Sequence, residues 1–416
     1  MKEIADKFGI PENLDAISLG WEESLAAMPS GIPDFLKPEN FVPAARFCGF
    51  NPDIEPLLIA TAEQICKDDA LLHFCWHCFH QLTDGSHPVN YNKCPDFKKE
   101  LGDKFGIFYL LVGLGVVPGA RAAYMRMNIP GDIIRHTMKE IEGFNENHKI
   151  AHKLPGLLTN QLSWIGNYYK GKLFRLGRME YKIEPFHFRR FFYRNRKTGF
   201  KICFAPDNVL HNGEGFIVGA GGTADEKNGW TSSFYEENGI ICGNPVSPYG
   251  HALKKKLQVS LKEWEPALKP NDWTIDLHIP PGGGMTPEAC LDSFKTAFDF
   301  FSSRFPEKKS SAIVCSSWIF NTQFEAYLPD SNMVKLMREL YLFPVQSVGN
   351  DGMFFVFYRE FKDLSRAPRE TRLQKAMLDI LESGGKLRSS GMVFFMEDLK
   401  HFGTGHYRKD WDEMER

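Results

Sequence analysis

Apolar residues recur at three- and four-residue spacing through much of the first part of the chain, the pattern of helices that bury one face. Turn-forming pairs such as Asp84-Gly85 and Pro155-Gly156 separate these stretches, and such pairs commonly interrupt helices. From about residue 55 to 170 we therefore predict a helical region. Its clearest stretches are Leu57–Leu82, Asp96–Val117, Asp132–Asn145 and Leu158–Tyr168.

The pattern changes after Lys170-Gly171, where short segments alternate apolar and polar residues as half-buried strands do. A long passage around Gly221–Gly250 has the composition of loops. Predicted strands are Lys172–Ile183, Phe186–Tyr193, Phe200–Ala205, Gly215–Ala220, Leu257–Leu261, Trp273–Ile279, Ala312–Trp318, Phe343–Val348, Met353–Tyr358 and Gly391–Met396. Predicted helices are Pro287–Phe305, Thr322–Tyr341 and Glu370–Glu382.

Most of these strands follow one another directly, and one strand–helix–strand crossover lies among them. That order favours a mostly antiparallel sheet flanked by helices. We therefore expect an α+β protein with an all-helical N-terminal domain over residues 1–170 and a mixed domain over residues 171–416.

The stretch IDLHIPPGGGMTPEAC, residues 275–290, joins the clearest strand to the clearest helix start. Along the strand, Thr274, Asp276 and His278 share one face, which we expect to line a cleft. Thr286 is a preferred N-cap residue, and Pro287 suits the first helical position. Three glycines before a helix N-terminus bare main-chain N–H groups that can hold an anion. The competing interpretation is a tight turn that needs only glycine dihedral angles.

Composition and charge narrow the classes of function. The 416 residues are 43% hydrophobic and 25% charged, with a formal net charge of −2, so we expect no nucleic-acid partner. The longest apolar run, Phe105–Val117, has about 13 residues against the ~20 of a membrane helix, so no membrane span is expected. Nine cysteines and a first segment with acids but no apolar core favour a reduced, cytoplasmic protein without a secretory signal.

The segment LHFCWHCFH, residues 72–80, places three histidines and two cysteines on one helix. A zinc protease needs a glutamate where Phe74 stands, and a redox dithiol needs a helix start. We therefore interpret the segment as a core helix with hydrogen-bonded histidines, and we predict no metal site.

In its order of elements, the mixed part of the chain resembles the GNAT superfamily of acyl-coenzyme A-dependent N-acyltransferases. More closely, the chain resembles a two-domain group with a helical N-terminal domain and a GNAT-like C-terminal domain. The segments that carry the resemblance are WIGNYYKGKLFRLGRMEY (Trp164–Tyr181), LHIPPGGGMTPEAC (Leu277–Cys290), FFSSRFPEKKSSAIVCSSW (Phe300–Trp318) and LPDSNMVKL (Leu328–Leu336).

This resemblance implies a coenzyme A site. Main-chain N–H groups from Gly282 to Thr286, that is Gly282, Gly283, Gly284, Met285 and Thr286, would hold the pyrophosphate. The strand end from Leu277 to Ile279 would lie along the pantetheine arm. The usual GNAT loop begins with Arg or Gln, whereas this one reads PPGGGMT, so binding would rest on the main chain and the helix dipole.

The same resemblance implies direct transfer of an acyl group from acetyl-CoA or another acyl-CoA to an amine. His278 is the expected base, since histidine titrates near neutral pH and Asp276 lies beside it to orient it. The Ile279 N–H would polarise the carbonyl, and Tyr327, or alternatively Tyr341, would protonate the thiolate. The acceptor is expected to be a small-molecule or peptide amine. The alternative is a non-catalytic GNAT-like binding or scaffold protein, and the oligomeric state is left open.

Overall fold

The computed structural model describes residues 1–9, 11–85, 89–218, 228–359, 361 and 363–415. Its contacts divide the chain into two compact units. One comprises Met1–Arg175 with Pro280–Gly282, and the other comprises Leu176–Ile279 with Gly283–Arg416.

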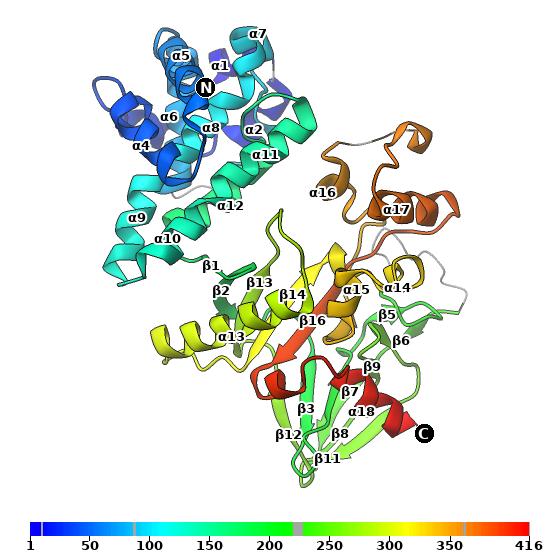
Figure 1. Ribbon diagram of the computed structural model, residues 1–416. Helices are drawn as coiled ribbons and strands as arrows, with labels where there is room; N and C mark the ends of the chain where they lie inside the picture. Colours follow the sequence, from blue (N-terminus) through cyan, green and yellow to red (C-terminus); the bar gives the residue numbers. More distant parts are fainter. Residues whose placement is uncertain (10, 86–88, 219–227, 360, 362, 416) are drawn as a thin grey trace. The chain divides into compact units, whose positions relative to one another are not determined.

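The first unit is built from helices, as the spacing of apolar residues predicts (Figure 1). Three predicted helices are each divided in the structure: Asp96–Val117 spans α7, α8 and the start of α9, and Asp132–Asn145 spans α10 and α11. Leu57–Leu82 forms α5 and α6, because α5 ends at Cys66 and Asp68 caps α6 through hydrogen bonds from the N–H groups of Ala70 and Leu71. The helices are α1 (Lys2–Lys7), α2 (Leu14–Ile17), α3 (Trp21–Ala26), α4 (Pro38–Phe47), α5 (Glu55–Cys66), α6 (Asp69–Thr83), α7 (Lys98–Leu101), α8 (Phe105–Gly115), α9 (Val117–Arg126), α10 (Gly131–Met138), α11 (Glu140–His152) and α12 (Leu162–Tyr169).

Helix α8 forms the centre of this unit, and every residue from Phe105 to Leu114 is buried. Together with α7 and α9 it belongs to the one helical stretch of the described residues, Lys98–Arg126, whose length and apolar composition would suffice to cross a membrane. Of its most apolar 18-residue window, 72% is buried inside the protein, and a core helix has the same properties.

Two of the three histidines of α6, His77 and His80, are buried and make side-chain contacts, as the sequence predicts, whereas no contact of His73 is among those described. The ring of His77 contacts Ser24 Oγ through Nδ1 at 2.9 Å and the Ile17 carbonyl oxygen through Nε2 at 2.9 Å. His80 Nδ1 lies 3.3 Å from the same hydroxyl, and Gln81 donates to it at 2.9 Å. Both cysteines of the segment are buried, and desolvation raises the pKa of the Cys75 thiol well above its ordinary value. These contacts join α6 to α2 and α3.

A six-stranded sheet has the strand order β1-β2-β13-β14-β16-β15; five of its strands lie in the second unit, and the boundary after Arg175 falls within β1. Strands β13 and β14 pair in parallel, and α13 connects them as the predicted crossover. The sheet is otherwise antiparallel at β2–β13, β14–β16 and β15–β16, which confirms the α+β class. Its strands are β1 (Phe174–Leu176), β2 (Met179–Pro185), β13 (Trp273–His278), β14 (Ala312–Ser317), β15 (Tyr341–Pro344) and β16 (Ser390–Phe395).

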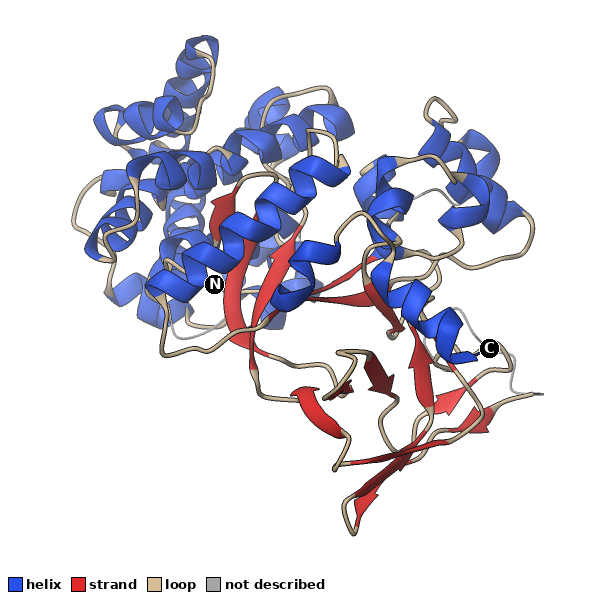
Figure 2. Cartoon of the chain, turned by 60° about the horizontal axis from the view of Figure 1, so that its bottom comes forward, coloured by secondary structure: helices blue, strands red, loops and turns tan. Residues whose placement is uncertain are grey.

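Helix α13 (Pro287–Arg304) lies along one face of this sheet (Figure 2). Its Ser293 hydroxyl contacts the Tyr181 hydroxyl at 2.8 Å, and its Phe294 ring packs against Phe394 of β16. On the other face, Tyr341 of β15 packs against Phe192 of a second sheet. Phe192 also packs against Phe395, so β16 is covered on both faces.

The prediction of a loop-rich passage around Gly221–Gly250 was wrong for its described part, because residues 228–250 contain strands. They belong to further sheets with the orders β10-β9-β4-β3-β12, β11-β8-β7 and β5-β6. Residues 221–227 of the region lie outside the described residues. The strands are β3 (Phe191–Asn195), β4 (Lys201–Phe204), β5 (Leu210–His211), β6 (Trp230–Thr231), β7 (Phe234–Glu237), β8 (Ile240–Gly243), β9 (Pro245–Ser247), β10 (His251–Ala252), β11 (Leu257–Ser260) and β12 (Trp264–Leu268).

A predicted strand in the last part of the chain is also wrong, because Met353–Tyr358 forms a short helix. Gly352 with φ 88° and Tyr358 with φ 53° end it on either side. In the described part of Gly215–Ala220, the only strand-like feature is the isolated bridge of Ile217 to His211. The remaining helices are α14 (Phe324–Tyr327), α15 (Asn332–Met337), α16 (Met353–Phe357), α17 (Arg372–Glu382) and α18 (His406–Glu415).

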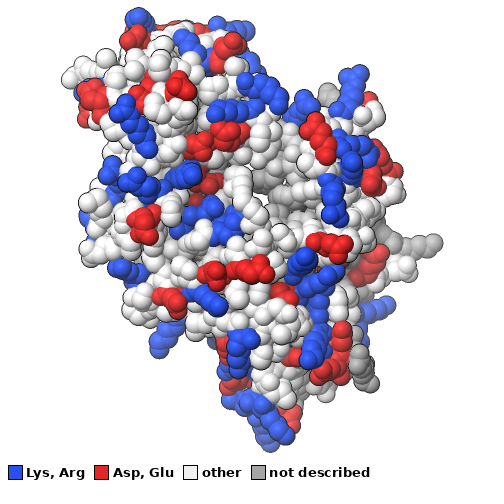
Figure 3. Space-filling model, in the orientation of Figure 1, with Lys and Arg blue, Asp and Glu red and all other residues white. Residues whose placement is uncertain are grey.

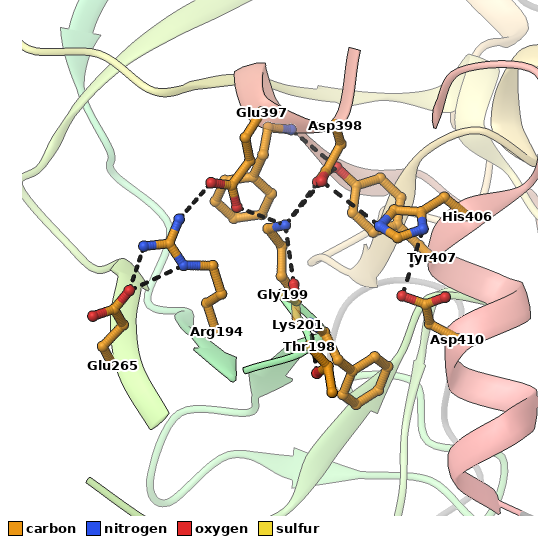
Figure 4. A network of polar contacts seen from close by, with 12 residues as sticks. Arg194, Thr198, Gly199, Lys201, Glu265, Glu397, Asp398, His406, Tyr407 and Asp410 are labelled. Carbon is orange, nitrogen blue, oxygen red and sulfur yellow. Dashed lines mark hydrogen bonds and ion pairs between the residues drawn. The ribbon is translucent and has the colours of Figure 1, made fainter. Parts of the chain in front are cut away.

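A network of charged groups joins the C-terminal segment to the second sheet (Figure 4). The buried Lys201 of β4 lies 2.8 Å from a Glu397 oxygen and 2.9 Å from an Asp398 oxygen. Tyr407 donates to Asp398 at 2.8 Å. Elsewhere, acidic and basic side chains are interspersed on the surface seen in Figure 3, in keeping with the small net charge.

Candidate active site

A polar row follows the face of the β2–β13 pair that lies opposite α13. The antiparallel register places His278 across from Glu180, Asp276 across from Lys182, and Thr274 across from Glu184. This confirms the predicted alternation, since Ile275 and Leu277 occupy the other face of β13 and are buried. The row is less open than expected: Asp276 is only 5% exposed.

His278 and Asp276 are in contact. The Nε2 atom of His278 lies 2.9 Å from Oδ2 of Asp276. The His278 side chain is 27% exposed and that of Asp276 is 8% exposed. A carboxylate beside Nε2 favours the tautomer that carries its proton on Nε2, in which Nδ1 is the basic nitrogen.

Lys182, which sequence analysis did not single out, completes this cluster. Its Nζ atom lies 3.3 Å from Oδ2 of Asp276 and 3.1 Å from Oε2 of Glu184. Burial alone would raise the pKa of Asp276, but His278 and Lys182 together hold that pKa below its ordinary value. Burial likewise opposes the charge of Lys182, yet Asp276 and Glu184 raise its pKa. Asp276 is therefore ionised and Lys182 is charged at neutral pH.

The ends of β13 and β14 separate at this point of the sheet. The two strands pair only at Ile275 with Ile313 and at Asp276 with Val314. Beyond these pairs, β13 remains paired with β2 as far as His278, and β14 remains paired with β16 as far as Ser317. No ladder pairing joins Leu277–His278 to Cys315–Ser317 in the described sheet. The β13–β14 ladder therefore stops before the end of either strand.

The glycine loop follows directly. Gly282 and Gly283 have φ of 73° and 62°, left-handed values that favour glycine, so these two positions fit the turn interpretation. Gly284 has no such value, and a Cβ atom there would meet only the Thr286 methyl group, at 3.8 Å. The fold itself therefore does not require glycine at residue 284. Gly282, Gly283 and Gly284 are all exposed.

The start of α13 has the predicted cap. The Thr286 side-chain oxygen accepts a hydrogen bond from the Ala289 N–H at 3.3 Å, and Pro287 is the first helical residue. Met285, just before the cap, packs against a buried cluster formed mainly by α14 to α17, which includes Phe324, Met353 and Phe357. The loop is thus anchored on both sides of its exposed glycines.

Arg178 is a second residue that sequence analysis missed. It lies in the turn between β1 and β2, and its Nε donates to the Gly284 carbonyl oxygen at 3.3 Å. Its Nε also lies 3.6 Å from the place of a Cβ on Gly283. The loop itself lacks the expected Arg or Gln, but the guanidinium of Arg178, from the turn between β1 and β2, contacts the loop. The sequence signal was the second arginine of FRLGRMEY, whose position depends on strand pairing.

The two candidate acids differ in position. Tyr341 is 1% exposed, and its hydroxyl donates to the Val246 carbonyl oxygen at 2.6 Å and accepts from the Cys203 N–H at 3.1 Å. These contacts occupy it in the second sheet. Tyr327 ends α14 and is 42% exposed. Among the described contacts, none joins Tyr327 to His278 or to the loop.

Comparison with protein families gives two matches. Residues 173–394 match a GNAT-like C-terminal domain, and residues 43–171 match an N-acyltransferase N-terminal domain. A comparison with curated proteins gave no match.

Solved structures share the fold over nearly the whole chain. An acyltransferase in complex with decanoyl-CoA and teicoplanin has a TM-score of 0.62 at 18% identity, and the similarity covers 95% of this chain and 99% of the other. An acyltransferase in complex with CoA and 10C-teicoplanin has a TM-score of 0.63 at 18% identity, with the same coverage. A Trp-to-Ala variant in complex with octanoyl-CoA has a TM-score of 0.61 at 19% identity, covering 95% and 98%.

Proposed function

Because the chain belongs to the family with a GNAT-like C-terminal domain and is a two-domain GNAT-type acyltransferase, we propose that it transfers an acyl group from coenzyme A to an amine. The observation that carries this proposal is the separation of β13 and β14 beyond Asp276. It opens the sheet beside His278 and next to a capped helix start.

Coenzyme A binding is supported by three features of the loop. The N–H groups at the start of α13 and the helix dipole favour a pyrophosphate. The Arg178 guanidinium beside Gly284 adds a positive charge. The absence of a side chain at Gly284, which the fold does not require, allows phosphate oxygens to approach the main chain. The strand end Leu277–Ile279 would then pair with the pantetheine amides.

In the proposed reaction, the amine nitrogen attacks the thioester carbonyl carbon, and the carbon–sulfur bond breaks. His278 takes the amine proton on Nδ1 while Asp276 holds Nε2. The N–H of Ile279 polarises the carbonyl oxygen. The leaving thiolate is protonated by Tyr327 or by water; Tyr341 is a poor candidate because its hydroxyl is bound in the second sheet.

We propose an apolar acyl group longer than acetyl. Trp318 directly follows β14, where the strands have separated, and its ring stacks with that of Phe355, which is 60% exposed. Such a surface favours an alkyl chain by burial of apolar area. Octanoyl- and decanoyl-CoA are ligands of the similar acyltransferase structures. Teicoplanin in one of them supports a small-molecule or peptide acceptor with an amine.

The test is a thermal-shift titration with free CoA, acetyl-CoA and octanoyl-CoA, followed by release of free thiol in the presence of amines. Ligand at about 100 times its Kd should stabilise the protein by roughly 2.7 kcal/mol. We expect all three to raise Tm, with octanoyl-CoA effective at the lowest concentration. No rise in Tm with any of them at millimolar concentration would reject the proposal. A rise in Tm without thiol release for any amine would favour the alternative, a binding protein without catalysis.

A further inference from the structure

Asp276 Oδ2 is shared between two basic groups. The Nε2 atom of His278 lies 2.9 Å from it and the Nζ atom of Lys182 lies 3.3 Å from it. Lys182 comes from β2, directly across the strand pair from Asp276. The carboxylate is buried, and a buried carboxylate needs a counter-charge.

The other titratable groups that face His278 cannot replace this counter-charge. From β2, Glu180 lies across from His278 and Glu184 binds Lys182, and both are acidic. From β14, the buried Cys315 thiol lies near Asp276, and desolvation raises its pKa well above the ordinary value, so it stays neutral. Among these groups of β2 and β14, Lys182 is therefore the one cation beside Asp276, apart from His278 when its ring is protonated.

Lys182 places a positive charge at the same Asp276 oxygen that His278 contacts. This charge opposes the addition of a second positive charge on the His278 ring. Without Lys182, the buried carboxylate would be balanced only by an imidazolium, which cannot accept a proton from the amine.

We propose that Lys182 is a positioning residue of the acyl transfer: its positive charge at Asp276 Oδ2 opposes a positive charge on His278, which contacts the same oxygen, and so favours the form of the ring that accepts the amine proton. This inference rests on the proposed function. It concerns a lysine that acts through Asp276 and does not touch the substrate.

The first experiment compares Lys182→Met, Lys182→Arg and the control Lys308→Met. The Nζ atom of Lys308 lies 4.8 Å from the centroid of the Trp273 ring, at the start of β13. Lys308→Met therefore also removes a lysine that contacts β13, but one that is not paired with Asp276. The pH dependence of kcat/KM for thiol release is measured with octanoyl-CoA and an accepted amine. We expect Lys182→Met to shift the acidic limb of the kcat/KM profile to higher pH by roughly one pH unit, which is the effect of one nearby charge in a partly screened site. In Lys182→Arg and Lys308→Met, the acidic limb of the profile should lie at the same pH as in the wild type.

Two further measurements separate this inference from its alternatives. Adding Lys182→Met to Asp276→Asn should cause no additional shift, since the lysine acts through that carboxylate. The pH at which the His278 ring gains a proton is also followed by NMR in the free protein, with His278→Gln to assign the signal. This readout needs no turnover, so it remains valid if the proposed reaction is wrong.

A higher titration point for His278 in Lys182→Met supports the inference even without activity. An unchanged acidic limb and an unchanged His278 titration in Lys182→Met would overturn it, whether or not the wild type is active. If Lys182→Met does not fold, Lys182→Gln is used under the same criteria. A shift of similar size in Lys308→Met would also overturn it, because the effect would then not depend on Asp276.

Discussion

His278 and Asp276, two residues apart on β13, touch across 2.9 Å on the polar face of the sheet. The contact places Nε2 against the carboxylate, and in the proposed reaction this leaves proton transfer to Nδ1. Strand alternation alone brings both side chains to one face, and the packing of β2 buries the carboxylate beneath the ring.

If His278 is the base, His278→Ala should lower turnover at neutral pH by roughly 10²–10⁴-fold, the usual contribution of general base catalysis. Binding of coenzyme A should persist, since no main-chain group of the loop changes. Thiol release and the CoA-dependent rise in Tm are measured on the same samples. If both are lost together, His278 has a structural role.

Arg178→Met should weaken free CoA binding by about tenfold, because a charge-assisted hydrogen bond contributes roughly 1.5–3 kcal/mol and this site is partly exposed to solvent. The affinity is measured by calorimetry at two salt concentrations, and the difference from wild type should shrink at high salt. Arg366→Met is the control, since the Arg366 side chain is 84% exposed on a different segment. Equal affinities for the wild type and Arg178→Met would exclude a role for Arg178 in anion binding.

The two neighbouring glycines should respond differently to alanine. Gly283→Ala places a Cβ at φ 62° and should destabilise the protein by about 1–2 kcal/mol. Gly284→Ala meets only the Thr286 methyl group and should change stability by less than about 0.5 kcal/mol while weakening CoA binding. Urea unfolding and CoA calorimetry on both variants test this. A Gly284→Ala protein that binds CoA as well as wild type does would favour the simple turn.

Acid should destabilise the helical unit. Burial lowers the pKa of His77 and of His148 to about 4, despite a hydrogen bond from each ring to a main-chain carbonyl group that acts in the opposite direction. The unfolded chain takes up these protons near pH 6.5 and the folded chain does not, so stability is lost as pH falls from 6.5 towards 4. Each histidine contributes roughly 1.4 kcal/mol per pH unit in this window. Urea unfolding at pH 7.0 and pH 5.0 measures it, and equal stabilities would contradict the prediction.

Part of the site could be predicted because it depends on neighbours along the chain. The alternation of Thr274, Asp276 and His278, the Thr286 cap and the start of α13 at Pro287 follow from dihedral preferences and local hydrogen bonds. Helical spacing likewise predicted the first unit. Where local signals were ambiguous the prediction failed: Met353–Phe357 is an apolar run too short to distinguish strand from helix, and left-handed residues at both ends made it a helix.

The sequence by itself determined a strand, a bare glycine loop and a capped helix, together with a base and its carboxylate on one strand face. Only the tertiary structure decided which charges surround them. Lys182 meets Asp276 through the register of β2 with β13, about a hundred residues apart, and Arg178 reaches Gly284 from the β1–β2 turn. The separation of β13 from β14 depends on each strand keeping its outer partner. Such pairings are set by the packing of distant segments, and no local spacing encodes them.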